Sequence, residues 1–193
     1  MAIELVLGLG NPGEDYADTR HNVGFRVVEE VARRHGVFEW IERPSSEVAA
    51  ITVGRLVVLA RPQTFMNRSG EAARWLLDEF DVMPEAILVV VDDIDLPLAS
   101  LRLRRSGGPG THNGLRDLCE EVGTAFPRLR VGVRGDELSG DLADYVLSPF
   151  SESEAEAADT AIARSADAVE SALKDGFEAA MNIYNRPVGR GGH

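Results

Sequence analysis

The chain has 193 residues, of which 44% are hydrophobic and 27% are charged, and its formal net charge is −12 at pH 7. These proportions are typical of a globular protein with a substantial core, and no apolar stretch reaches the ~18 residues of a membrane span. The N-terminus has no basic lead and carries Glu4 inside its apolar run, unlike a secretory signal peptide. Cys119 is the single cysteine, which excludes an intrachain disulfide and favours a cytoplasmic location.

Basic residues are concentrated in one part of this acidic chain. Arginine outnumbers lysine 19 to 1, and residues 100–134 hold seven arginines against three acidic residues, a local balance of +4 that leaves −16 for the remainder. An acidic protein repels nucleic acid at long range, but a basic patch binds phosphates at close range. Two interpretations of this segment therefore stay open: a phosphate-binding surface, or a charged sheet face in contact with solvent.

Apolar runs of strand length alternate with segments of helical periodicity. In chain order, the pattern predicts a strand at 3–9, a helix at 22–35, a hairpin of strands at 48–53 and 56–60, a helix at 69–80, strands at 87–91 and 101–104, a helix at 114–122, a strand at 129–133 and a long helix from residue 151. This order is typical of an α/β fold. We expect a single globular domain over residues 1–188, with a twisted mixed β-sheet surrounded by helices, and a disordered tail at 189–193.

Several residues predict how these elements begin and pack. Asn113 is placed to cap the helix at 114–122, and Ser151 with Glu154 has the pattern of a capping box. The fully apolar strand at 87–91 should be central in the sheet, whereas the alternating strand at 101–104 should be half-exposed. The C-terminal helix is expected to bury one apolar stripe, made of Ile162, Ala166, Val169, Leu173, Phe177 and Met181.

The segment GLGNPG at 8–13 matches the glycine pattern of a dinucleotide-binding loop after a strand. That function requires a helix that starts within the glycines, so that its N-terminus meets the pyrophosphate. Here Pro12 interrupts the pattern and a polar loop at 14–20 follows. The acidic residue that should bind the ribose would also fall inside the next helix. We therefore expect the glycines to form a sharp turn that projects Asn11.

His21 and Asp92 are candidates for an acid–base pair. His21 lies at the start of a helix, where the helix dipole disfavours the imidazolium and suits a neutral base. Such a histidine is more often structural, but Asp92 follows the central strand at the edge of the sheet where α/β sites form. Two other roles are open for the carboxylates of Asp92, Asp93 and Asp95. They could bind Mg²⁺, or they could form a turn before Pro97.

Three asparagines occur in glycine-rich or turn sequences: Asn11, Asn67 and Asn113. Asparagine in such places commonly serves turns and helix caps. Its amide can also hold a substrate backbone or stabilise a developing oxyanion. Cys119 shares a helical face with Leu115 and Val122, so we expect it to be a core residue rather than a reactive thiol.

Six segments in this order resemble the bacterial peptidyl-tRNA hydrolase family: GLGNPGEDYADTRHNVGF (8–25), RPQTFMNRSG (61–70), VDDIDLP (91–97), GGPGTHNGLRD (107–117), RLRVGV (128–133) and DYVLSPF (144–150). The combination is highly specific. The resemblance implies a monomer with a mixed sheet surrounded by helices. It also implies cleavage of the ester between a peptide and the terminal ribose of tRNA, without metal or cofactor.

The resemblance also implies roles for the motif residues of this chain. His21 is similar to the general base that activates water, and Asp92 to the carboxylate that orients it. The amides that hold peptide carbonyls and stabilise the tetrahedral intermediate correspond to Asn11, Asn67 and Asn113. Residues that line the family's cleft correspond to Tyr16, Met66 and His112. The basic pair that clamps a tRNA phosphate corresponds to Arg104 and Arg130.

Two rival functions remain at this point. A dinucleotide-dependent oxidoreductase would bind NAD(P). A tRNA-binding paralogue would be non-catalytic and release no peptide, or would act on a narrower substrate. The second rival is suggested by positions where the chain departs from the family pattern. These include Val91, Thr111 and the segment 135–193, which holds twelve acidic and four basic residues. The complete set of polar motif residues favours the hydrolase, because binding alone requires no base–carboxylate pair.

Overall fold

The computed structural model describes residues 2–135 and 140–186. In this part of the chain, seven strands form one sheet in the order β2-β3-β4-β1-β5-β7-β6. The strands are β1 (Leu5–Gly8), β2 (Ile41–Glu42), β3 (Ser46–Thr52), β4 (Leu56–Pro62), β5 (Ile87–Pro97), β6 (Leu101–Arg104) and β7 (Arg128–Arg134). The four central strands are parallel, and β2, β3 and β6 are antiparallel to their neighbours. The predicted α/β class with a mixed sheet is confirmed.

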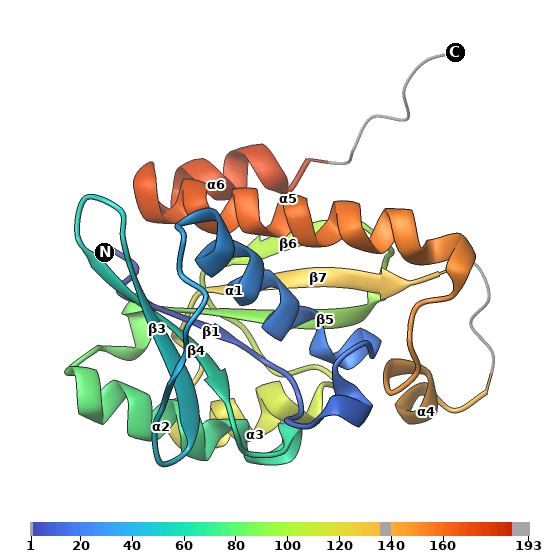
Figure 1. The fold of residues 1–193 in the computed structure, drawn as a ribbon, viewed down its shortest axis with the longest axis horizontal. Coiled ribbons are helices and arrows are strands. Elements are labelled where there is room, and N and C mark those ends of the chain that lie inside the picture. Colours follow the sequence, from blue (N-terminus) through green and yellow to red (C-terminus); the bar gives the residue numbers. More distant parts are fainter. Residues whose placement is uncertain (1, 136–139, 187–193) are drawn as a thin grey trace.

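Helices cover both faces of the sheet (Figure 1). One face carries α1 (Val23–Arg34), α5 (Ala155–Lys174) and α6 (Phe177–Tyr184), and the other carries α2 (Ser69–Phe80) and α3 (Asn113–Val122). Each face has its own apolar cluster, and β5 lies between them: Leu88 and Val90 join the first cluster, whereas Val89 and Val91 join the second. Burial on both faces explains why this strand is apolar at every position from 87 to 91.

The glycines of the 8–13 segment allow a helix and a strand to pack closely. A Cβ atom on Gly8 would lie 2.2 Å from the carbonyl oxygen of Gly24 in α1, and one on Gly10 would lie 2.7 Å from the Phe25 ring. Gly13 has a φ of 107°, a conformation that favours glycine. The glycines thus bring α1 against β1 and turn the chain sharply after Asn11, as expected.

The structure differs from the sequence prediction at four places. The C-terminal helix is two helices, because Gly176 has a φ of 97° and breaks it between α5 and α6. Strand β5 continues to Pro97, because Asp92 and Asp93 pair with β7. His112, not Asn113, is the N-cap of α3. Periodicity also missed the short strand β2 and the five-residue helix α4 (Leu142–Val146).

Other local predictions are confirmed. Strands β3 and β4 form the predicted hairpin around Gly54, and Ser151 and Glu154 make both bonds of the capping box. Strand β6 alternates buried and exposed residues. Cys119 is partly buried at the edge of the second apolar cluster. The predicted disordered tail at 189–193 lies outside the described residues. No helix in residues 2–135 and 140–186 is long and apolar enough to cross a membrane.

Candidate active site

One cavity of about 570 Å³ lies where several strands and helices begin or end. Asn11 follows β1, Asp92 belongs to β5, and His21 lies in the 3₁₀ turn η2 (Arg20–Asn22) that precedes α1. The carboxyl edge of parallel strands is where α/β proteins place ligands. The cavity brings together nine of the ten predicted site residues: Asn11, Tyr16, His21, Met66, Asn67, Asp92, His112, Asn113 and Arg130.

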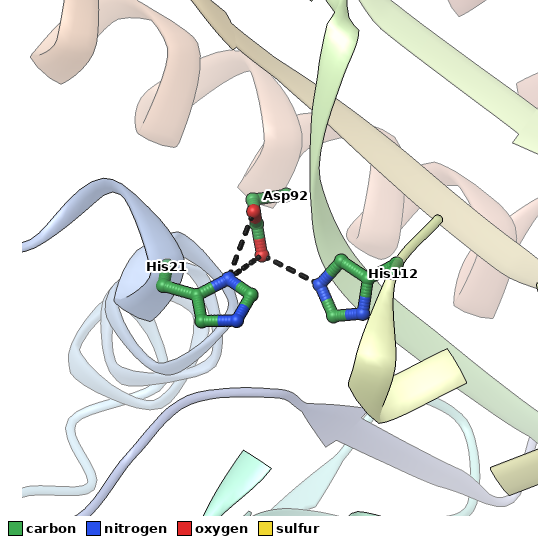
Figure 2. Close-up of side chains that lie close together, drawn as sticks. All are labelled: His21, Asp92 and His112. Carbon is green, nitrogen blue, oxygen red and sulfur yellow. Dashed lines mark hydrogen bonds and ion pairs between the residues drawn. The ribbon is translucent and has the colours of Figure 1, made fainter. Parts of the chain in front are cut away.

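His21 and Asp92 form the predicted pair (Figure 2). Nδ1 of His21 lies 2.9 Å and 3.0 Å from the two carboxylate oxygens of Asp92, and Asp92 is only 2% exposed. Because a carboxylate only accepts, Nδ1 carries the proton and donates it. This leaves Nε2, on the opposite side of the ring, as the basic atom. Asp92 therefore fixes both the tautomer and the orientation of the imidazole.

Burial and charge oppose each other at this pair. Burial by itself lowers the pKa of His21, but the charge of Asp92 and its hydrogen bond outweigh burial and raise the pKa above the ordinary value of 6.5. Burial would likewise raise the pKa of Asp92, yet His21 and His112 together hold it well below its usual range. Asp92 is thus a carboxylate at neutral pH, and its charge favours the protonated form of His21.

A second imidazole contacts the same carboxylate (Figure 2). Nε2 of His112 lies 2.9 Å from Oδ1 of Asp92, and Nδ1 of His112 accepts a 3.2 Å hydrogen bond from the backbone N–H of Leu115. The ring centroids of His21 and His112 are 4.9 Å apart. Both nitrogens of His112 are therefore engaged within the protein, so a substrate can meet this ring only through its carbon atoms. The sequence missed this arrangement.

The same three side chains form the one cluster of potential metal ligands among the described residues, with donor atoms within 4.8 Å of one another. A histidine that binds a metal through Nε2 normally carries its proton on Nδ1 and donates it to a partner. Nδ1 of His112 instead accepts from the Leu115 N–H. The hydrogen bonds of the site therefore do not fit a resident metal ion.

The magnesium alternative for the aspartates does not fit either. Oδ2 of Asp93 lies 3.0 Å from Nε of Arg130 in an ion pair. Its other oxygen accepts from the backbone N–H of Asp95 at 2.9 Å. Asp92 is occupied by the two histidines. The carboxylates of Asp92 and Asp93 are therefore engaged by histidine N–H groups, an arginine and a backbone N–H rather than gathered around a common cation position.

Asn11 is held by its backbone and by one side-chain oxygen. Asn22 donates to the carbonyl of Asn11 at 2.9 Å and accepts from its backbone N–H at 2.8 Å. Oδ1 of Asn11 accepts from the backbone N–H of Met66 at 2.8 Å. The Nδ2 group of Asn11 therefore remains as the donor that this amide offers to the cavity. The sequence prediction missed Asn22, which is 2% exposed and holds the backbone of Asn11 in place.

Asn67 and Asn113 present two more amides to the cavity. Asn67 lies in the 3₁₀ turn η3 (Met66–Arg68) between β4 and α2. Asn113 is the first residue of α3, and its Oδ1 accepts from Arg116 at 3.3 Å. This bond leaves the Nδ2 group of Asn113 as a donor, as in Asn11. The three amides thus line the same cavity as the His21–Asp92 pair and come from three different segments.

Apolar side chains form the other walls of the cavity. Tyr16 meets Phe65 edge to face, with ring centroids 6.3 Å apart. Helix α4, which periodicity missed, contributes Leu142, Ala143 and Val146, and Leu147 follows it in the same wall. The cavity therefore combines apolar lining residues with a few polar groups, as ligand pockets commonly do.

The two predicted phosphate-binding arginines occupy neighbouring strands. Arg104 in β6 pairs in register with Arg128 in β7, and Arg102 pairs with Arg130. Arg104 and Arg130 therefore project from the same face of the sheet, two register positions apart. Arg130 lines the cavity, whereas Arg104 lies outside it and is exposed. Arg128 is buried and donates to the carbonyls of Gly108, Thr124 and Phe126, which fixes the loop before His112.

Three comparisons with known proteins point to one family. Residues 5–190 match the family model described as peptidyl-tRNA hydrolase. The peptidyl-tRNA hydrolase of Chloroflexus aggregans is 50% identical over 184 residues, which cover 94% of this chain and 98% of the relative. That of Roseiflexus castenholzii is 46% identical over 186 residues, 95% of this chain and 87% of the relative. The crystal structure of peptidyl-tRNA hydrolase from Acinetobacter baumannii superposes with a TM-score of 0.88 at 35% identity, and covers 95% of this chain and 94% of that one.

Proposed function

The chain belongs to the peptidyl-tRNA hydrolase family, and we propose that it hydrolyses the ester between a peptide, or an N-blocked amino acid, and the 3′-terminal ribose of tRNA. The observation that supports the catalytic assignment is the His21–Asp92 pair, buried beside three amides in one cavity. A base, a group that orients it and donors for an oxyanion are the parts that ester hydrolysis requires.

In the proposed reaction, Nε2 of His21 takes a proton from a water molecule as the water oxygen attacks the ester carbonyl carbon. The carbonyl oxygen becomes an oxyanion, and Asn11, Asn67 and Asn113 are the candidate donors that stabilise it and hold the neighbouring peptide carbonyls. The intermediate then expels the ribose oxygen, which receives the proton from His21. Asp92 stabilises the imidazolium between the two transfers.

The substrate is an activated ester with a good leaving group, so a positioned water and a neutral imidazole can suffice. General-base catalysis contributes about 10²–10⁴-fold in rate, and removal of one oxyanion donor costs about 10²–10³-fold. The apolar walls, formed by Tyr16, Met66 and α4, are proposed to receive the peptide. These walls can accept many side chains while the amides orient the peptide backbone.

Arg104 and Arg130 are the proposed contacts to a tRNA phosphate. They project from one face of adjacent strands next to the cavity, and phosphate contacts fix the register of a nucleic acid without reading its sequence. One enzyme could thus act on many tRNAs. We further propose that the protein works as a monomer in the cytoplasm, where this substrate arises.

The test is release of N-acetylaminoacyl product from an N-blocked aminoacyl-tRNA, with the wild type and His21→Ala compared at low and moderate salt. We expect release by the wild type and a loss of at least about 10²-fold in the variant. A wild type that binds the tRNA but releases nothing at any salt would overturn the proposal. The protein would then be a binding-only relative.

A further inference from the structure

Two imidazoles donate to one carboxylate in the cavity. Asp92 receives Nδ1–H of His21 and Nε2–H of His112, each at 2.9 Å from Oδ1. Asp92 is 2% exposed, so no water shell spreads its charge. Each N–H that the carboxylate accepts reduces the charge that it can offer to the other partner. The geometry therefore couples His112 to His21 through Asp92, although the two rings make no hydrogen bond to each other.

The tautomer of His112 is fixed by the start of α3. His112 is the N-cap of this helix, and its Nδ1 accepts the Leu115 N–H. An imidazole nitrogen that accepts has no proton, so the single ring proton lies on Nε2 and points to Asp92. Protonation of Nδ1 would break the cap bond. The helix cap thus leaves the N–H of His112 directed at Asp92.

Few other titratable or charged groups approach His21. Tyr16, Asp93 and Arg130 line the same cavity, and the last two form an ion pair with each other. The neighbour of His21 in sequence, Arg20, pairs with Glu154 and stacks on Tyr145 of α4. The nearest basic residue of α1, Arg26, pairs with Asp159. Asp92 and His112 are therefore the polar partners that decide when His21 is protonated.

We propose that His112 is a positioning residue that acts through Asp92: its N–H holds the carboxylate in place and withdraws part of its charge from His21, so that the base stays neutral over a wider pH range. This role rests on the proposed function, in which His21 must be neutral to accept a proton from water. Asp92 raises the pKa of His21, so an Asp92 without its second partner would hold more of the base as imidazolium.

The test separates the bond to Asp92 from the helix cap. In His112→Ser the hydroxyl can still accept the Leu115 N–H, since serine is a strong N-cap residue, but it is too short to reach Asp92. We expect the imidazole resonance of His21, followed by NMR, to titrate with its midpoint raised by about half to one pH unit, the order of one charge-assisted hydrogen bond. The rising limb of hydrolysis against pH should move by the same amount.

An unchanged NMR midpoint in His112→Ser would overturn the proposal. His112→Asn, also a good cap and also too short, gives a second measurement if the serine variant does not fold. His112→Ala should show the same shift with a lower melting temperature, because it loses the cap as well. The NMR titration needs no substrate, so its result stands even if the protein fails to hydrolyse peptidyl-tRNA.

Discussion

Arg20, the residue before His21, forms a two-point ion pair with Glu154, the residue that precedes α5. Its two terminal nitrogens lie 3.2 Å and 2.7 Å from the carboxylate oxygens. The guanidinium lies over the rings of Tyr145 and Phe150, at 4.3 Å and 4.7 Å from their centroids. One buried arginine therefore joins the turn that carries His21 to α4, which forms a wall of the cavity, and to the C-terminal helices.

Removal of Glu154 should destabilise the protein strongly. Arg20 is 5% exposed, and a buried charge that loses its partner costs about 3–5 kcal/mol. We expect Glu154→Ala to lower the free energy of unfolding by about 3 kcal/mol, the lower end of that range, because Glu154 itself is partly exposed. Chemical denaturation measures the loss. Glu156→Ala, an exposed glutamate in the first turn of α5, is the control; equal losses in the two variants would contradict the assignment.

The same pair predicts how stability depends on pH. The hydrogen bonds from Arg20 lower the pKa of Glu154 from 4.5 to about 2. A carboxylate with a lowered pKa stabilises the folded state above its unfolded value and loses this contribution as pH falls through the folded value. The advantage of the wild type over Glu154→Gln should thus be constant above about pH 5 and shrink as the pH falls towards 2. An advantage independent of pH would exclude the charge as its source.

Asp92→Asn should impair the base without unfolding the protein. An asparagine can present its N–H₂ to Nδ1 of His21 and so favour the wrong tautomer. We expect kcat to fall by about 10²–10⁴-fold. The rising limb of the remaining activity against pH should also move to lower pH than in the wild type, because Asp92 raises the pKa of His21. Asp95→Asn, an exposed neighbour in β5, is the control. Unchanged turnover in Asp92→Asn would remove this residue from the mechanism.

The sequence predicted the parts of the site that depend on local order along the chain. An apolar strand followed by Asp92, and a histidine at the start of a helix, could be expected to meet because parallel strands end at a common edge. The hairpin around Gly54 and the capping box at Ser151 depend on neighbours within a few residues, and both are confirmed.

Contacts between distant segments could not be predicted in this way. His112 and Asp92 are 20 residues apart, and Arg20 and Glu154 are 134 residues apart. Asn113 is the better N-cap residue by preference, but the bond from His112 to Asp92 sets the loop so that the histidine takes that position. The apolar stripe of the C-terminal helix continues past Gly176, so its pattern did not show the break.

Arg104→Ala should weaken tRNA binding and its dependence on salt. Each phosphate contact releases about one counterion, so the loss of one contact reduces the slope of log K against log salt by about 1. Filter binding or fluorescence titration over a series of salt concentrations measures the slope. Arg43→Ala is the control, because this exposed arginine follows β2 at the opposite edge of the sheet. An unaltered slope in Arg104→Ala would mean that the basic face of β6 only contacts solvent.

Gly8→Ala should destabilise the contact between β1 and α1. The added Cβ would lie 2.2 Å from the backbone oxygen of Gly24, and this oxygen cannot move aside unless α1 shifts. Overpacking of this kind costs roughly 1–3 kcal/mol, measured as a loss in the free energy of unfolding. Gly108→Ala is the matched control, because nothing lies within 4 Å of the added atom and its φ is not positive. Since α1 follows directly on the turn of His21, a Gly8→Ala protein that kept full stability and full activity would show that the close approach of helix and strand is not needed to place the base.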